Sequence, residues 1–198
     1  MIYGARELAE SFRTVRRNTI QIAEEIPEDK YSFRATPEVR SVAEELAHVA
    51  CATWWQQQVH GVDKKTVIAF DDFGKYMGRV TAMEQELKTK AQIVDALKKN
   101  GGKFASFIDG LGDEQLAEIV SFPPPVQPSQ RSRLEMLMSA KEHEMHHRAK
   151  LMVAERLLGI VPHLTRRRQE MMAERAAAAA ASAPAAAGVA AGQAAPQS

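Results

Sequence analysis

The stretch formed by residues 131–159 constrains the fold more than any other part of the sequence. Its leucines and methionines recur at spacings of three, four and seven residues, which is the pattern of a long amphipathic helix. Gly159, followed closely by Pro162, is the stop signal expected at the C-terminal end of such a helix. We therefore expect the chain to be built from helices that bury one another's apolar faces.

Two helices are expected in the N-terminal part of the chain. Residues 5–26 place apolar side chains on one stripe and are followed by Pro27, which ends the helix. Residues 42–58 form the second helix. It begins after Ser41, which has Glu44 three residues later and so completes a capping box.

The middle of the chain is read as loop, helix and extended connection. Residues 61–78 have no clear period and are expected to form a loop, whereas residues 81–99 have helical spacing. Asn100, Gly101 and Gly102 look like a break. Residues 104–111 restore the apolar spacing after it, so one kinked helix or two short ones are both compatible with the pattern. Residues 119–126, which end next to three prolines, are expected to be extended.

Helices that alternate with loops, without alternating strand patterns, predict an all-α four-helix bundle. We place this domain at residues 1–164. Residues 165–198 then form a charged helical extension and a tail. The tail, from residue 176 onward, is almost entirely alanine with scattered proline and glycine, so it has no side chains for a core and is expected to be disordered.

Composition excludes several classes of function. The 26 lysines and arginines nearly balance the 25 aspartates and glutamates, which argues against nucleic-acid binding by bulk charge. Cys51 is the single cysteine, so no intramolecular disulfide can form, as is usual in a reducing cytoplasm. The N-terminus lacks the apolar core of a signal peptide, and no apolar run is long enough for a membrane span. We expect a cytoplasmic protein without a membrane partner.

Three histidines suggest a metal site. His143 and His147 lie one turn apart on the same face of the expected helix, whereas His146 lies about 100° around it and should not share their site. His48 falls in the middle of the second helix, next to two alanines that leave room around it. Together His48, His143 and His147 could hold one metal ion. The alternative is that His48 is a hydrogen-bonded core residue and the pair is partly exposed.

Three imidazoles alone would leave a coordination position open for water or substrate, which is typical of catalytic sites. Imidazole ligands suit zinc, nickel, iron or copper, so the ligand set does not identify the ion. Glu142 and Glu144 flank His143, and we expect both to face solvent. Cys51 lies one turn from His48, and we expect it to be a buried thiol that packs against Trp55.

Two segments, IPEDKYSFRATPEVRSVAEELAHV and EHEMHHRAKLMVAERLLGIVPHL, resemble the DinB-like superfamily of damage-inducible four-helix bundles. The resemblance covers residues 5–164. It implies a divalent metal, zinc or nickel first, bound by His48, His143 and His147. It also implies that the metal activates a low-molecular-weight thiol for transfer to an electrophilic small molecule, and that the protein forms a homodimer. Relatives often read HHRGQL where this chain has Ala149 and Lys150, so a pocket built around that glutamine is in doubt.

Two other functions stay open at this point. The chain could be a non-catalytic stress-response module that binds a metal or another ligand at the same site. It could also be a metal-dependent hydrolase, which would need a general base, and only Glu142 or Glu144 offers one. A polar group directed at the open coordination position would separate an enzyme from a binding module, and the sequence does not place one.

Overall fold

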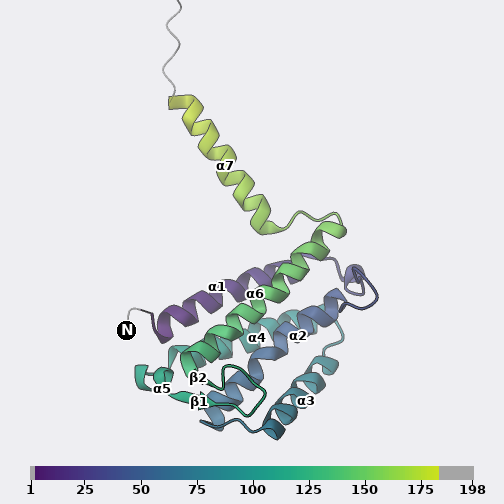
Figure 1. Cartoon of the computed structure of the whole chain (residues 1–198). Helices are drawn as coiled ribbons and strands as arrows, with labels where there is room; N and C mark the ends of the chain where they lie inside the picture. The colour runs from purple at the N-terminus through teal and green to yellow at the C-terminus, as the bar shows by residue number, and fades with distance from the viewer. Residues whose placement is uncertain (1–2, 183–198) are drawn as a thin grey trace, which may run out of the picture. The chain divides into compact units, whose positions relative to one another are not determined.

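Figure 1 shows the computed structural model of the chain, in which residues 3–182 are described. The chain divides into two compact units, Met1–Pro162 and His163–Ser198. The first unit contains six helices and a short two-stranded sheet among the described residues, and the second contains one helix. Within residues 3–182, no helix has both the length and the apolar character needed to cross a membrane.

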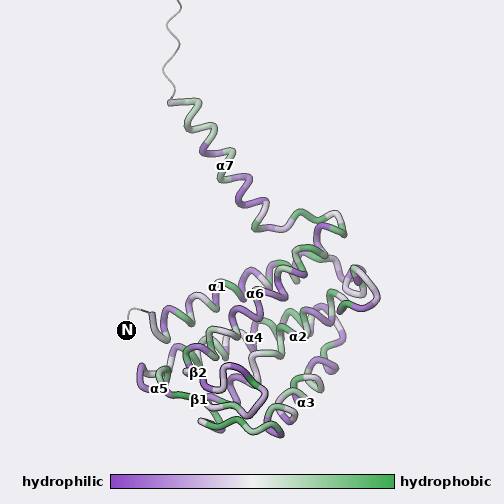
Figure 2. The backbone as a smooth tube through the Cα atoms, viewed as in Figure 1, coloured by the Kyte–Doolittle hydropathy of each residue, from purple (hydrophilic) through white to green (hydrophobic). Residues whose placement is uncertain are grey.

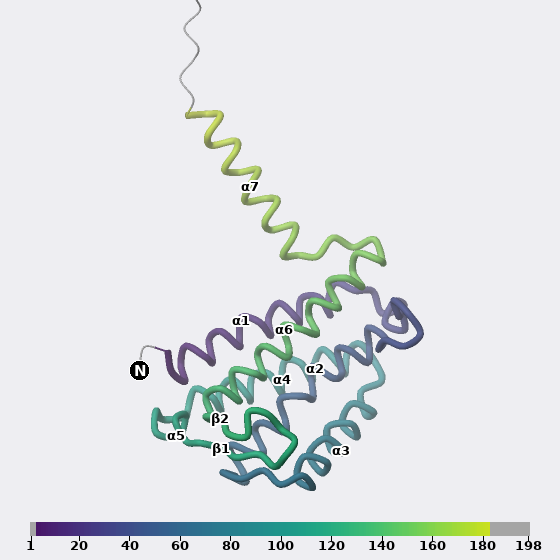
Figure 3. Tube along the Cα trace, in the orientation of Figure 1, coloured from purple at the N-terminus to yellow at the C-terminus, as the bar shows by residue number. Residues whose placement is uncertain are grey.

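Four long helices form the body of the first unit, and the predicted four-helix bundle is confirmed. They are α1 (Ala5–Glu25), α2 (Val42–Gln57), α4 (Lys90–Asp109) and α6 (Arg133–Leu157). Helices α1 and α2 each pack against both α4 and α6. As Figure 3 shows, α6 returns alongside α1 although the two are far apart in the sequence. Helices α2 and α6, which carry the three histidines of interest, are therefore neighbours.

Local signals set the ends of the two site-bearing helices. The Ser41 hydroxyl accepts a hydrogen bond from the Glu44 amide (3.2 Å), and the Glu44 carboxylate accepts one from the Ser41 amide (2.8 Å). This is the predicted capping box, and it satisfies two amides at the start of α2. Ser132 caps α6 in a similar way, and Gly159 follows α6 with a positive φ of 78°. Glycine adopts that conformation without strain, so the predicted stop is confirmed.

Apolar side chains fill the space between the helices. Hydrophobic and hydrophilic residues alternate along the helices of the bundle, as Figure 2 shows. One cluster joins Phe12 of α1 to Phe104 of α4, whose rings meet edge to face at 5.0 Å between centroids. A second cluster gathers around Leu46 of α2 and Leu97 of α4. Burial of these side chains fixes the inward face of each helix, and with it the direction of the histidines.

The helices between α2 and α6 differ from the sequence prediction. Helix α3 (Phe70–Glu86) begins halfway through the segment expected to be a loop, and burial of Tyr76 and Val80 holds it against the bundle. The expected helix over residues 81–99 is interrupted before Thr89, whose side chain caps the start of α4. Helix α4 then continues through Gly101 and Gly102, so the predicted break there is wrong.

The connection into α6 also contains structure that the sequence did not reveal. A short helix, α5 (Asp113–Ala117), precedes strand β1 (Ile119–Ser121), which pairs antiparallel with β2 (Gln130–Ser132). The expected extended connection over residues 119–126 is thus partly a strand. At the same end of the bundle, α2 finishes in a π-helical turn, Gln58–Val62, whose His60 is buried and contacts Arg133 at the start of α6.

The second unit begins with α7 (His163–Ser182). The expected charged extension is therefore helical, and the helix also includes the first residues of the alanine-rich stretch. Residues 183–198, which make up most of the tail expected to be disordered, lie outside the described residues.

Candidate metal centre

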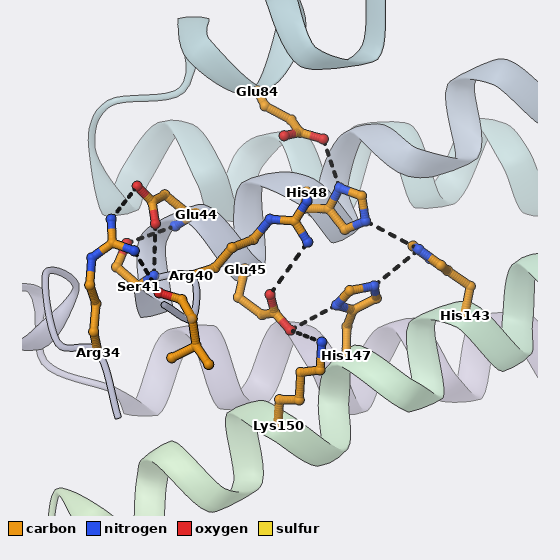
Figure 4. A network of polar contacts seen from close by, with 11 residues as sticks. Arg34, Arg40, Ser41, Glu44, Glu45, His48, Glu84, His143, His147 and Lys150 are labelled. Carbon is orange, nitrogen blue, oxygen red and sulfur yellow. Dashed lines mark hydrogen bonds and ion pairs between the residues drawn. The ribbon is translucent and has the colours of Figure 1, made fainter. Parts of the chain in front are cut away.

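The structure brings the three predicted histidines together. The Nε2 atom of His143 lies 3.1 Å from Nε2 of His48 and 3.0 Å from Nε2 of His147. The potential ligand atoms of all three residues lie within 4.8 Å of one another. Figure 4 shows the three rings turned toward a common point, with His48 contributed by α2 and the other two by α6. Helical spacing accounts for the pair, and the packing of α2 against α6 adds His48.

The spacing of the three nitrogens suits a small divalent ion. Zinc lies about 2.0–2.1 Å from imidazole nitrogens in a tetrahedral site, which places the nitrogens roughly 3.3 Å apart. The observed separations of 3.0–3.1 Å are close to that value. The donor set therefore fits a metal ion with little rearrangement, and a tetrahedral ion would keep one position for another ligand.

Two carboxylates contact the Nδ1 atoms of His48 and His147, on the side of each ring away from Nε2. Glu84 of α3 lies 2.7 Å from Nδ1 of His48, and Glu45 of α2 lies 2.7 Å from Nδ1 of His147. Each Nδ1–H donates to its carboxylate, which leaves the Nε2 lone pair directed at the common point. Sequence reasoning missed both glutamates. Glu45, which precedes His48 by three residues on the same helix, could have been found from its spacing, but Glu84 lies on α3, whose boundaries were misread.

Glu45 is also surrounded by positive charge. Arg40 lies 3.8 Å and Lys150 lies 3.6 Å from its carboxylate, as Figure 4 shows. Burial raises the pKa of Glu45, but the hydrogen bond from His147 and the two cations outweigh it, so the pKa falls below its usual value. Lys150 thus lies beside the carboxylate that holds a candidate ligand.

The electrostatic surroundings favour neutral imidazoles at the site. Burial lowers the pKa of His48 in spite of the hydrogen bond to Glu84. Loss of hydration and then the proximity of His147 lower the pKa of His143 to about 4. A neutral ring has the free lone pair that metal coordination requires.

Other predicted neighbours of the site take different positions. Glu142 is exposed as expected, but Glu144 is 2% exposed and pairs with Arg16 of α1, so its expected solvent-facing position is wrong. The reason is that α6 packs against α1 as well as α2, and Glu144 contacts Arg16 of α1. His146 is exposed and does not join the three-histidine cluster.

Cys51 belongs to the core and not to the site. Its thiol is 1% exposed and lies in the same cluster as Trp55, as predicted. Burial, reinforced by the negative charge of Glu84, raises the pKa of the thiol to about 12. A thiol that stays protonated is a poor nucleophile, so Cys51 is structural.

A pocket of about 280 Å³ opens beside the histidines, with His48 and His143 among its walls. Its apolar walls come from three helices, α2, α3 and α6: Ala52, Trp55, Met77, Val80 and Ala140. Its polar walls are Thr53, Gln56 and Ser139. No Asp, Glu, Lys or Arg from the described part of the chain lines it. Two of the three histidines therefore border a partly open and largely apolar space.

Comparisons with known proteins agree with this architecture. The sequence profile of the DinB superfamily matches residues 11–151. A solved DinB-like protein, YjoA from Bacillus subtilis, is similar with a TM-score of 0.56 at 23% identity, and the match covers 77% of this chain and 92% of that one. YfiT from Bacillus subtilis, described as a probable metal-dependent hydrolase with an unusual four-helix bundle topology, is similar with a TM-score of 0.59 at 14% identity. That match covers 79% of this chain and 88% of the other. None of the curated proteins matches the sequence.

Proposed function

The chain belongs to the DinB superfamily, and from that membership and its converging imidazoles we propose that it binds one divalent metal ion through His48, His143 and His147. The observation that carries the proposal is that Nε2 of His143 lies 3.0–3.1 Å from Nε2 of both His48 and His147, with the potential ligand atoms of all three residues within 4.8 Å of one another. Zinc and nickel are the proposed ions, because imidazole is a favourable ligand for both.

We further propose that the site activates a low-molecular-weight thiol for transfer to an electrophilic small molecule. A bound divalent ion would supply Lewis acidity, which favours the deprotonated form of a thiol. In the transfer, the thiol gives its proton to a base in solution and its sulfur forms a bond to the electrophilic carbon. The leaving group departs with the electrons of the bond that breaks. Glu84 and Glu45 keep the imidazoles oriented, and the apolar walls of the pocket limit access of competing water.

Hydrolysis is the second candidate, and it is favoured by the description of YfiT as a probable metal-dependent hydrolase. A side-chain base would assist attack by water, yet the described walls of the pocket contain no carboxylate. Of the two glutamates that flank His143, Glu144 is held by Arg16, and Glu142 is exposed and does not line the pocket. This distribution of charge supports thiol transfer over hydrolysis. A non-catalytic module that binds a metal or a ligand at the same site is the third candidate.

Metal analysis and a conjugation assay on the same preparations test these proposals. Untagged protein purified without chelator should contain about one zinc or nickel ion per chain, the stoichiometry of a single-ion site. The assay follows conjugation of a panel of small thiols to monochlorobimane, in which sulfur replaces chloride. His48→Ala should lose both the metal and the conjugation, whereas His146→Ala should retain both.

Each result selects among the candidates. Conjugation by metal-free His48→Ala at the wild-type rate would rule out the thiol-transfer proposal. Full metal occupancy without acceleration for any thiol would instead support the non-catalytic module. Hydrolysis of activated esters by the metal-loaded wild type, lost in His48→Ala, would favour the hydrolase.

A further inference from the structure

The pocket beside the histidines runs along α2. His48, Ala52 and Gln56 are spaced by four residues, so they form one stripe on that helix, and all three line the pocket. Eight residues of helix rise about 12 Å. From α6, His143 lines the same pocket at the metal end, one turn away from Ser139. A ligand in this pocket would therefore have one end at the histidines and the other near Gln56.

The space between these ends accepts an uncharged group. The side chains of Trp55, Met77, Val80 and Ala140 surround it, and no charged residue of the described chain lines it. Trp55 is itself packed edge to face against Phe73 at 6.0 Å between ring centroids. Moving a charge from water into such surroundings without a partner is costly. The body of the ligand must then be neutral and mainly apolar.

A chain of hydrogen bonds determines which atom Gln56 offers to the pocket. Arg133, which can only donate, donates from its guanidinium to Nδ1 of His60 (2.8 Å). His60 must therefore carry its proton on Nε2, and it donates that proton to Oε1 of Gln56 (2.9 Å). Burial, followed by the charge of Arg133, lowers the pKa of His60 to about 3, so the ring stays neutral.

The amide of Gln56 is thus held in one orientation. Its oxygen is used by His60, and within residues 3–182 its Nε2 atom donates no hydrogen bond to the protein. Gln56 is 3% exposed and lies on the wall of the pocket. This donor is therefore available to the pocket, where an acceptor on a ligand can take its hydrogen bond.

We propose that the pocket binds a neutral, mainly apolar small molecule whose hydrogen-bond acceptor, such as a carbonyl oxygen, receives the Nε2 hydrogen of Gln56 while its opposite end reaches the metal position. Gln56 is then a positioning residue that selects the ligand. This inference rests on the proposed metal site and adds to it the chemical class of the electrophile. The carbonyl of a bound electrophile would be fixed at a defined distance from its reacting end.

Matched hydroxamates on zinc-loaded full-length protein test the proposal, because a hydroxamate binds zinc and its tail enters the pocket. Para-acetylbenzohydroxamate carries a neutral acceptor, the para-isopropyl compound has the same shape without one, and the para-carboxylate adds a charge. Calorimetric titration should show the acetyl compound binding about tenfold more tightly than the isopropyl compound. The carboxylate should bind at least about tenfold more weakly than the acetyl compound.

Two variants locate the effect at Gln56. Gln56→Glu keeps an oxygen for His60 but loses the amide donor, and Gln56→Met loses the donor without adding charge; both should abolish the preference for acetyl over isopropyl. Gln57→Glu makes the same chemical change at a neighbouring position that does not line the pocket, and it should leave the preference intact. A purely structural role for Gln56 would weaken both compounds equally and overturn the proposal.

Metal content measured on the same samples distinguishes failure of the ligand-binding inference from failure of the proposed metal site. If zinc is bound and all hydroxamates, including acetohydroxamate, bind with equal affinity, the pocket does not select its ligand and this inference fails. The proposed metal site would then stand. If no zinc is retained, the proposed function fails, and the inference that rests on it fails too.

Discussion

The Arg16–Glu144 ion pair brings all four helices of the bundle together. The guanidinium of Arg16 contacts both oxygens of Glu144 at 2.9–3.0 Å and donates to the backbone carbonyls of Leu97 and Val49. The two charged side chains are 4% and 2% exposed. Removing one partner from such a pair leaves the other charged and buried, which typically costs 3–5 kcal/mol, whereas replacing both with apolar groups is often nearly neutral.

We therefore predict that Arg16→Met lowers the free energy of unfolding by about 3–5 kcal/mol in urea denaturation. The double variant Arg16→Met, Glu144→Met should recover most of that loss. Lys98→Met is the matched control, because Lys98 and its partner Glu24 are 55% and 49% exposed. It should cost no more than about 1 kcal/mol. Equal losses at Arg16 and Lys98 would show that the buried pair has no special role.

The low pKa of His60 in the folded protein predicts that stability depends on pH. Its pKa in the folded protein is about 3 because it is buried beside Arg133, while an unfolded histidine titrates near 6.5. Between these values the unfolded chain binds a proton that the folded chain does not, so stability must fall as the pH is lowered from about 6.5 toward 3. The full loss from this residue is roughly 5 kcal/mol, and it is absent above about pH 7.

The variant His60→Gln tests this contribution, because an amide can accept from Arg133 and donate to Gln56 without titrating. Urea unfolding over a series of pH values should give a shallower slope for the variant, by up to about 1.4 kcal/mol per pH unit. The other ionisable groups are the same in the two proteins, so their contributions cancel in the comparison. Identical slopes would contradict the assignment of a low pKa to His60.

At the scale of the helices, packing overrides propensity in α4. Gly101 and Gly102 suggest a break, but α4 continues through both, since Gly101 lies against the side chain of Arg16. A Cβ at Gly101 would come within 2.7 Å of Cγ of Arg16, whereas a Cβ at Gly102 would meet nothing within 4 Å. The side chain of Asn100 also donates to the backbone of Ala50 on α2 at 3.0 Å. Gly101 thus makes room for the buried arginine.

These adjacent glycines give a matched pair of variants. Gly102→Ala should stabilise the protein by about 0.5–1 kcal/mol, because alanine is the better helix former at an open position. Gly101→Ala should destabilise it by about 1–3 kcal/mol, because the added methyl displaces Arg16 from its partners. Thermal unfolding of both variants measures the difference. A stabilising Gly101→Ala would mean that the arginine can move aside freely.

The elements that sequence predicted well are those with local signals. The start of α2 at Ser41 and the end of α6 at Gly159 depend on neighbouring residues alone, and both were predictable. Helix α3 was not predictable, because its two glycines lower the helix propensity of the segment. The helix is held in place by burial of Tyr76 and Val80. The β1–β2 pairing likewise depends on a contact across a loop. Local chemistry is visible in a sequence, whereas burial depends on partners far along the chain.

The candidate site divides in the same way. The spacing of His143 and His147 is local, and His48 was added from its position in the middle of another helix beside small residues, which the family resemblance also implied. Glu84 and the buried position of Glu144 depend on contacts over long sequence separations, with α2 and with α1, and no local pattern signals them. The orientation of Gln56 requires a three-residue chain of hydrogen bonds that only the folded protein assembles.

For the whole molecule, a metal ion at the three histidines would join α2 to α6, whose residues His48 and His143 are 95 positions apart in the sequence. A ligand that binds only the folded state stabilises it in proportion to the logarithm of its concentration over its dissociation constant. With free zinc at about a thousand times that constant, the gain is about 4 kcal/mol, which corresponds to a rise of roughly 10 °C in the midpoint of thermal unfolding. We predict that removal of the metal with a chelator reverses this rise.

The histidine variants show whether that stabilisation arises at the proposed centre. His143→Ala should unfold at the same temperature with zinc and with chelator, because only two imidazoles remain to hold the ion. His146→Ala should keep the full zinc-dependent rise, since His146 lies on the same helix turn but outside the cluster. Differential scanning calorimetry of the three proteins measures these shifts. A zinc-dependent rise that survives in His143→Ala would place the bound metal elsewhere on the protein.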